Sequence, residues 1–98
     1  MSITVMIVYT GVGDAVKAFA KEMIESGIVK RIRMQEGNER YEYFFPMEDP
    51  SSLLLVDRWI DQEAIDIHHK SEMMEEIAQL RKKYKLSMKV QRYCDIEK

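Results

Sequence analysis

The residues best suited to chemistry lie in one short stretch of the chain, where a tryptophan precedes two adjacent histidines. Imidazole titrates near neutral pH, so His68 could take a proton from a substrate or hydrogen-bond a reaction intermediate. His69 points about 100° away on a helix, and we expect it to face solvent or a subunit boundary. His68 is therefore the predicted catalytic residue. The alternative is a helix-end histidine that hydrogen-bonds the backbone and packs against a sheet.

Aromatic and sulfur-containing side chains predict the wall of a binding cavity. Tyr41, Tyr43 and Phe45 alternate along one predicted strand and so share one face of it. They suit a flat substrate if that face looks toward the helices, and a dimer interface if it looks away. Trp59 either packs in the core or lines the cavity. Met73, one of eight methionines that either fill the core or line a pocket, completes the predicted substrate contacts.

Other reactive residue types carry weaker signals. Asp57 and Arg58 lie late in an apolar strand, where we expect a structural ion pair, with Arg40 or Arg92 as partners across the sheet. The adjacent histidines lack the three- or four-residue spacing of helical metal ligands, so no metal site is predicted. The single cysteine, Cys94, allows neither an internal disulfide nor a CxxC motif.

The composition is that of one small globular domain of 98 residues. A formal net charge of −2 and a pI of about 5.7 argue against a nucleic-acid partner, which would require a basic surface. No apolar stretch approaches the ~20 residues that cross a bilayer, so no membrane association is predicted. The first residues lack the basic and apolar segments of a secretion signal, and we expect a cytoplasmic protein.

Hydrophobic periodicity predicts alternating strands and helices. The predicted strands cover residues 3–9, 39–45, 53–60 and 86–94. The predicted helices follow the N-cap candidates Asp14, Asp61 and Ser71 and end near residues 26, 69 and 84. Residues 28–33 are either an extra helical turn or an irregular link, and residues 46–52 form a hairpin loop. Residues 95–98 are predicted to be a frayed tail.

This order of elements is the split βαβ arrangement of the ferredoxin-like α+β fold, a four-stranded antiparallel sheet with helices on one face. The strand patterns make both faces of the sheet apolar, and one helical layer covers only one of them. An uncovered apolar face is either an aggregation hazard or an interface. We therefore predict a homodimer in which two sheets pack face to face.

Residues 55–71, LVDRWIDQEAIDIHHKS, resemble the signature of the antibiotic biosynthesis monooxygenase family. In that family an acidic residue and a tryptophan end a strand, an alanine follows the capping turn, and a histidine precedes the second helix of a pair. The corresponding residues here are Asp57, Trp59, Ala64 and His68. The resemblance implies one domain over residues 1–98, with an ordered core of about 2–94. It also implies a dimeric α/β barrel with a ligand cavity between each sheet and its own helices.

The activity implied by the resemblance is oxidation of a small aromatic or quinol-like substrate without metal, flavin or other cofactor. One alternative is an isomerase of a small polar metabolite, which would need Arg58 or Arg92 as a charged anchor in the cavity. A second alternative is a non-catalytic dimer that binds a small molecule or a partner. Family members often carry a second histidine where this chain has Met73, so a mechanism that needs both is not predicted. The residues that haem-degrading relatives use do not match here, and haem degradation is excluded.

Overall fold

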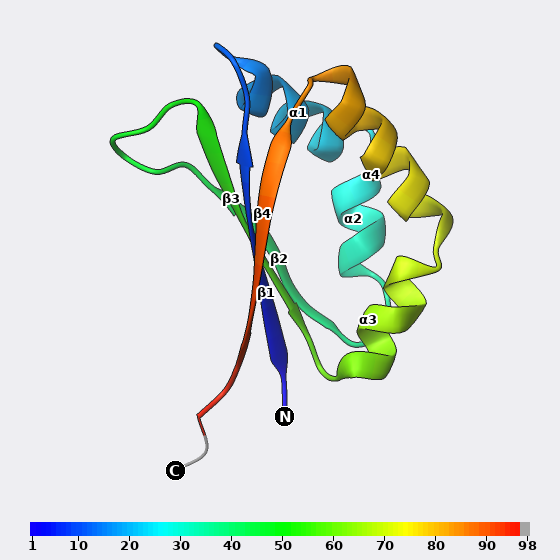
Figure 1. Cartoon of the computed structure of the whole chain (residues 1–98). Helices are drawn as coiled ribbons and strands as arrows, with labels where there is room; N and C mark the ends of the chain where they lie inside the picture. Colours follow the sequence, from blue (N-terminus) through cyan, green and yellow to red (C-terminus); the bar gives the residue numbers. More distant parts are fainter. Residues whose placement is uncertain (97–98) are drawn as a thin grey trace.

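Four strands and four helices make up the part of the chain that the computed structural model describes, residues 1–96. The strands are β1 (Ile3–Thr10), β2 (Asn38–Phe44), β3 (Ser52–Trp59) and β4 (Ser87–Cys94). The helices are α1 (Ala15–Glu25), α2 (Ile28–Arg33), α3 (Gln62–His69) and α4 (Glu72–Lys83). The strands form one antiparallel sheet in the order β2-β3-β1-β4, and the helices all lie on one side of it (Figure 1). The predicted ferredoxin-like α+β fold is confirmed.

The boundaries of the elements follow the sequence pattern closely, with two exceptions in the first half of the chain. Residues 28–33, predicted as either an extra helical turn or an irregular link, form helix α2, because Ile28, Val29 and Ile32 bury one side of it against the core. Gly27 begins this helix with φ +87°, a left-handed conformation that glycine adopts without strain. Ile24 fits the apolar spacing of α1 but is 57% exposed, so the buried stripe of that helix ends at Met23.

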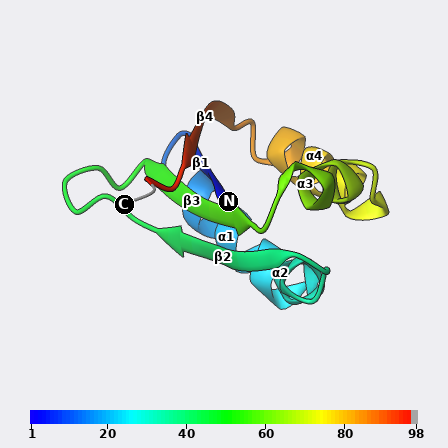
Figure 2. The ribbon, with the colours of Figure 1, turned by 90° about the horizontal axis from the view of Figure 1, so that it is seen from below.

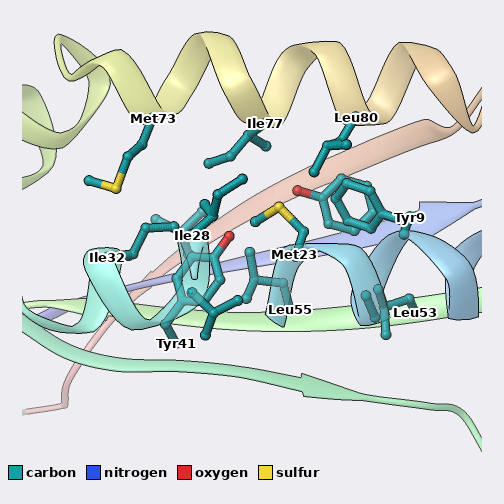
Figure 3. Close-up of a cluster of buried hydrophobic side chains, with 14 of the residues drawn as sticks. Tyr9, Met23, Ile28, Ile32, Tyr41, Leu53, Leu55, Met73, Ile77 and Leu80 are labelled. Atoms are coloured by element: carbon teal, nitrogen blue, oxygen red, sulfur yellow. The ribbon is translucent and has the colours of Figure 1, made fainter. Parts of the chain in front are cut away.

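The core fills the space between the sheet and the helices. Phe19 of α1 is fully buried, and its ring contacts those of Tyr9, Tyr43 and Tyr84 at centroid distances of 5.0, 6.4 and 6.5 Å. Above the sheet, α4 directs Met73, Ile77 and Leu80 down toward it (Figure 3). In the view from below, α3 and α4 run together beside the strands, while α2 lies under β2 (Figure 2). The pair α3 and α4 therefore forms one wall over the helix-facing side of the sheet. Within residues 1–96, no helix has the length and apolar character required to cross a membrane.

The turn between α2 and β2 is fitted closely to the start of α3. Gly37 has φ +88°, and its carbonyl oxygen accepts a hydrogen bond from the backbone N–H of Ile60 at 2.8 Å. A Cβ atom at this position would lie 2.6 Å from the Cβ atom of Ala64. Only glycine fits this combination of conformation and close approach. The turn therefore sets how near α3 comes to the end of β3.

The two aspartates expected to cap helices behave differently. Asp61 accepts a hydrogen bond from the backbone N–H of Ala64 at 2.9 Å, as predicted for an N-cap of α3. Asp14 occupies the N-cap position of α1, as predicted, but its side chain makes no capping bond within the described chain, because its backbone is not in the extended conformation that a capping side chain requires. Ser71 also lacks the capping bond among the described residues: its hydroxyl instead donates to the carbonyl oxygen of His68 at 2.7 Å.

We expect Asp61→Ala to lower the free energy of unfolding by about 1 kcal/mol, because the first turn of α3 loses its capping acceptor. Asp14→Ala is the matched control and should change stability by less than ~0.5 kcal/mol, as exposed substitutions away from caps do. Urea denaturation of both variants measures the difference. Equal losses would show that the Asp61 bond contributes nothing to stability.

The face of the sheet that is turned away from the helices, called here the open face, is apolar at its centre. Met6 and Val8 of β1 lie beside Leu54 and Val56 of β3 in the central strands, and no helix among residues 1–96 covers them. The outer strands depart from the prediction of an apolar face, because β2 places Arg40 and Glu42 there and β4 places Lys89 and Gln91. The open face is therefore an apolar centre with a polar rim.

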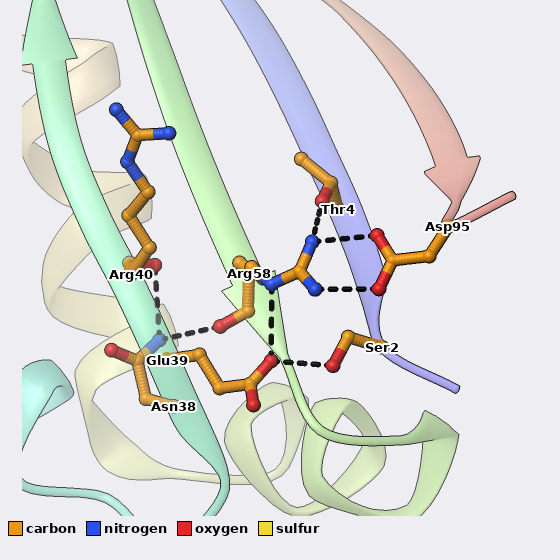
Figure 4. Close-up of polar contacts among 7 residues, drawn as sticks. All are labelled: Ser2, Thr4, Asn38, Glu39, Arg40, Arg58 and Asp95. Carbon is orange, nitrogen blue, oxygen red and sulfur yellow. Dashed lines mark hydrogen bonds and ion pairs between the residues drawn. The ribbon is translucent and has the colours of Figure 1, made fainter.

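Arg58 organises a polar cluster at one end of the open face (Figure 4). Its guanidinium donates to both carboxylate oxygens of Asp95, at 2.9 and 2.6 Å, to Glu39 at 3.1 Å and to the hydroxyl of Thr4 at 3.2 Å. Glu39 also accepts from Ser2 at 2.6 Å. The predicted frayed tail is wrong at Asp95, since this ion pair holds it against β3. Residues 97–98 of that predicted tail lie outside the described residues.

Candidate functional site

A cavity of about 290 Å³ lies between the helix-facing side of the sheet and the wall formed by α3 and α4. Its floor comes from all four strands, and its lining is mainly apolar, with Ile7, Leu55, Ile65, Ile77 and Val90 among the contributing side chains. At the lower end of the ~300–1,000 Å³ range of ligand pockets, the cavity suits a small molecule. The polar groups on this lining determine what chemistry the cavity can support.

Asp57 is the carboxylate on the floor of this cavity. It lies on β3 between Val5 of β1 and Tyr41 of β2, and it is 6% exposed. Its Oδ1 atom has no hydrogen-bond partner among residues 1–96. Burial raises the pKa of Asp57 to about 7, and the indole N–H of Trp59 only partly opposes this rise. A carboxyl group in this state can hold or release a proton at neutral pH.

His68 faces the cavity from the last turn of α3 and is 4% exposed. Its Nδ1 atom lies 2.7 Å from Oε1 of Gln35, and its ring stacks on Trp59 with the centroids 4.7 Å apart. Burial lowers the pKa of His68 to about 4, with a smaller contribution from neighbouring His69. At pH 7 the ring is neutral, so His68 offers the cavity a hydrogen-bonding imidazole and not a charge.

Aromatic side chains close two sides of the cavity. Trp59 is 1% exposed and lines it, so the indole belongs to the core and to the cavity wall at once. Tyr9 and Tyr41 are both buried, and their hydroxyl groups point into the space between the sheet and α4 (Figure 3). Burial raises the pKa of Tyr9 to about 12 and also raises that of Tyr41, so both remain protonated hydrogen-bond donors near neutral pH.

Two arginines bring positive charge to the cavity from the side of α4 and β4. Arg81 reaches it from the last turns of α4, and its Nε atom is buried without a partner among the described residues. Arg92 reaches it from β4 and donates to Oε1 of Gln62. Neither forms an ion pair within residues 1–96. In the same part of the chain, no three histidine, cysteine, aspartate or glutamate side chains gather into a metal site.

The family model for antibiotic biosynthesis monooxygenases matches residues 2–80, most of the chain. The chain belongs to the antibiotic biosynthesis monooxygenase family. No curated protein matches it. The predicted family is thus confirmed, and the resemblance of the stretch around Trp59 is part of a match that also covers β1, α1 and β2.

Solved structures with the same fold span bacteria and archaea. A protein of Deinococcus radiodurans, proposed to be an antibiotic biosynthesis monooxygenase, superposes with a TM-score of 0.84 at 15% identity, over 100% of this chain and 95% of that one. A conserved protein of Methanosarcina mazei gives 0.81 at 22% identity, over 95% and 91%. SnoaB, a cofactor-independent oxygenase of Streptomyces nogalater, gives 0.80 at 12% identity, over 99% and 95%. At these identities the likeness shows the fold alone.

Three of the residues predicted for the site of this family member lie on the cavity, and three do not. His68, Trp59 and Tyr41 line it. Tyr43 has the same strand parity as Tyr41 but packs half-buried against the core beside it, at a ring distance of 5.8 Å. Met73 is buried in the core, and the neighbouring Met74 lines the cavity instead. Phe45 lies outside because β2 ends at Phe44, which leaves Phe45 48% exposed in the following loop.

Asp57 lines the cavity, although the sequence pattern predicts a structural ion pair for it. A structural ion pair was predicted for Asp57 and Arg58, with Arg40 or Arg92 as partners, but Arg58 pairs with Asp95 and Glu39 on the open face. Asp57 takes part in no ion pair within the described chain. The alternation of side chains along a strand indicates the true position of Asp57. Asp57 lies two residues from both Leu55 and Trp59 and therefore shares their face.

Proposed function

We propose that this family member oxidises a small aromatic or quinol-like molecule with dioxygen, without a bound cofactor, in the cavity between the sheet and α3 and α4. The observation that carries the proposal is a small, mainly apolar cavity whose lining includes a buried carboxyl group, a neutral imidazole and aromatic side chains. Membership of the monooxygenase family supports the same reaction class.

The proposed reaction begins with deprotonation of a substrate hydroxyl. The resulting electron-rich anion reduces dioxygen directly, one oxygen atom enters the substrate ring, and the other leaves as water. A quinol and one dioxygen molecule then give a hydroxyquinone and one water molecule, so no external reductant is consumed. The contribution of the protein is a dry, shaped cavity and groups that move or hold the proton.

His68 is proposed to hydrogen-bond the substrate hydroxyl or the oxygenated intermediate. Its ring lines the cavity and is neutral, and contact with Gln35 and the stacked Trp59 holds it in one orientation. The Ser71 hydroxyl bound to its carbonyl oxygen fixes the helix end that carries it. The geometry therefore suits positioning of an oxygen atom in the cavity.

We expect His68→Ala to reduce oxygen consumption with menadiol, a naphthalene quinol, by about 10- to 100-fold, the loss that accompanies removal of one strong hydrogen bond. His69→Ala is the comparison, since this histidine is exposed at the edge of the cavity, and it should change the rate less than ~3-fold. With ¹⁸O₂ the wild-type product should gain one labelled oxygen. Equal rates in wild type and His68→Ala would remove His68 from the mechanism, and an unlabelled quinone would contradict oxygen insertion.

One observation supports the isomerase of a small polar metabolite as a second candidate. That reaction needs a charged anchor, and Arg92 lines the cavity while Arg58 lies on the open face. The largely apolar lining favours the oxidation of an aromatic molecule over this alternative. A non-catalytic binding protein would be favoured by side chains that fill the gap between helices and sheet, whereas a cavity of about 290 Å³ lies there.

We further propose that two copies of the chain pair through the open face. Its apolar centre, Met6, Val8, Leu54 and Val56, is surrounded by charged and polar side chains of β2 and β4, an arrangement typical of protein interfaces. Phe44 and Tyr93 add exposed aromatic surface at the rim, at 40% and 47%. Packing of two such faces would bury this surface in a closed two-fold pair.

Light scattering of the purified chain should give twice its mass of 11.6 kDa. Met6→Lys should shift the chain to a monomer, because it places a charge at the centre of the proposed interface. Val12→Lys is the control, since Val12 is exposed in the loop before α1, and it should leave the mass unchanged. A monomeric wild type, or a Met6→Lys dimer, would contradict the proposed pairing.

A further inference from the structure

The carboxyl group of Asp57 stands out among the polar groups of the cavity because it forms no ion pair within the described chain. It sits on a central strand, is 94% buried and has an unpartnered oxygen atom on the cavity side of the sheet. A buried acceptor without a partner is costly to maintain, so such a group in a binding cavity points to a ligand that supplies the missing donor.

The nearest arginine in sequence cannot supply that donor. Arg58 follows Asp57 directly, so its side chain emerges on the opposite face of the sheet, where Asp95 and Glu39 bind it. The polar network of the open face therefore holds Arg58 away from Asp57. The carboxyl group is left facing the cavity.

We infer that Asp57 is the general base of the cavity and accepts the proton of the substrate hydroxyl group. This inference rests on the proposed function. In the step, the substrate O–H bond breaks, an O–H bond forms on the Asp57 carboxylate, and the electron pair stays on the substrate oxygen as a phenolate. After dioxygen has bonded to a ring carbon, its O–O bond breaks and Asp57 returns the proton to the oxygen atom that departs as water. The second hydrogen atom of that water comes from the substrate.

His68 is less suited to this step than Asp57. Its Nδ1 atom is engaged by Gln35, and burial lowers its pKa to about 4, whereas burial raises the pKa of Asp57 to about 7. A base is most effective when its pKa lies near the working pH, and the two environments separate the roles of the two residues. Asp57 takes the proton while neutral His68 holds the oxygen atom.

The titratable and charged groups around Asp57 come from every element packed against it. They are Tyr9, Tyr41, Tyr43, His68, His69, Arg81 and Arg92. The three tyrosines are held protonated by burial, which raises their pKa values, and His68 is neutral. Between pH 5 and 8, Asp57 is thus the buried group of the cavity whose charge changes.

Asp57→Asn tests the inference with two readouts, and Asp14→Asn is the matched control because Asp14 is exposed and makes no capping bond in the described chain. In carboxyl ¹³C NMR, wild type should show one aspartate that titrates near pH 7, and Asp57→Asn should lose that signal. With menadiol, the wild-type rate should rise about tenfold per pH unit below pH 7 and then level off. Asp57→Asn should lose this rise and fall about 10²- to 10⁴-fold, while Asp14→Asn keeps both.

The possible results distinguish a failure of the role of Asp57 as a base from a failure of the proposed function. If wild type oxidises menadiol and Asp57→Asn retains the rate within ~3-fold, Asp57 is not the base and the proposed function stands. If no aspartate signal near pH 7 disappears in Asp57→Asn, the inference is overturned whatever the rates are. If wild type consumes no oxygen with quinols, the proposed function fails and the inference falls with it.

Discussion

Asp57→Asn is expected to raise the free energy of unfolding by about 2–3 kcal/mol at pH 8 and to give no gain at pH 4. The wild-type carboxylate is buried without a partner among residues 1–96, and its pKa is raised from 3.8 to about 7. That interval of about three pH units corresponds to about 4 kcal/mol at 1.36 kcal/mol per unit. Part of the gain is lost because the asparagine amide is also buried without full hydrogen bonding.

The direction in which stability changes with pH follows from the protons that the folded and unfolded chains bind. Between pH 3.8 and about 7 the folded protein holds a proton on Asp57 that the unfolded chain has released. Stability from this group is therefore present below pH 3.8 and is lost as the pH rises through 7. His68 acts in the opposite direction: its pKa is lowered to about 4, so its contribution is present above pH 6.5 and is lost as the pH falls toward 4.

Urea denaturation of wild type and Asp57→Asn at pH 4, 6 and 8 measures this effect. The difference between the two proteins isolates Asp57, because the contribution of His68 is common to both. Asp14→Asn, an exposed substitution of the same kind, should track wild type at every pH. A difference that does not vary with pH would show that Asp57 titrates normally in the folded protein. A variant that is more stable but inactive would mark a residue retained for function at a cost in stability.

Trp59→Ala is expected to lower the free energy of unfolding by about 3–5 kcal/mol, a large share of the stability of a domain of this size. The indole is 1% exposed, and it fills the space between β3 and the end of α3. Its loss also removes the surface on which the His68 ring stacks. We therefore expect the pKa of His68 to move from about 4 back toward 6.5 as water reaches the ring.

Trp59→Phe distinguishes packing from polar effects at the same position. It should cost less stability than Trp59→Ala, since most of the buried apolar surface remains. The pKa of Asp57 should rise above 7, because the phenylalanine ring lacks the N–H group that opposes the effect of burial. Phe45→Ala, at a 48% exposed aromatic residue in the loop after β2, is the control and should change stability by less than ~1 kcal/mol. Thermal denaturation and NMR titration give both quantities, and an unchanged His68 pKa in Trp59→Ala would refute the coupling.

Much of the architecture could be predicted because hydrophobic periodicity is a local property. The apolar runs of β1 and β3 and the apolar stripes of α1 and α4 predict the order of elements and the single helical layer, and the Asp61 cap of α3 follows from one residue type at one position. The capping bond of the Asp14 side chain and the place of Phe45 were wrong, because a capping bond depends on backbone angles and a strand end can shift by one residue.

The sequence by itself determined that Leu55, Asp57 and Trp59 share one face of β3, and that Arg58 lies on the other. Only the tertiary structure decided that the first face looks into the cavity, because period-two alternation separates the faces of a strand without saying which one the helices cover. The tertiary structure also determined which groups surround the charged side chains of Arg58 and Asp57. Arg58 meets Asp95 and Glu39, 37 and 19 residues away, while Asp57 meets apolar and aromatic walls, and contacts over such separations are set by strand pairing and not by local pattern.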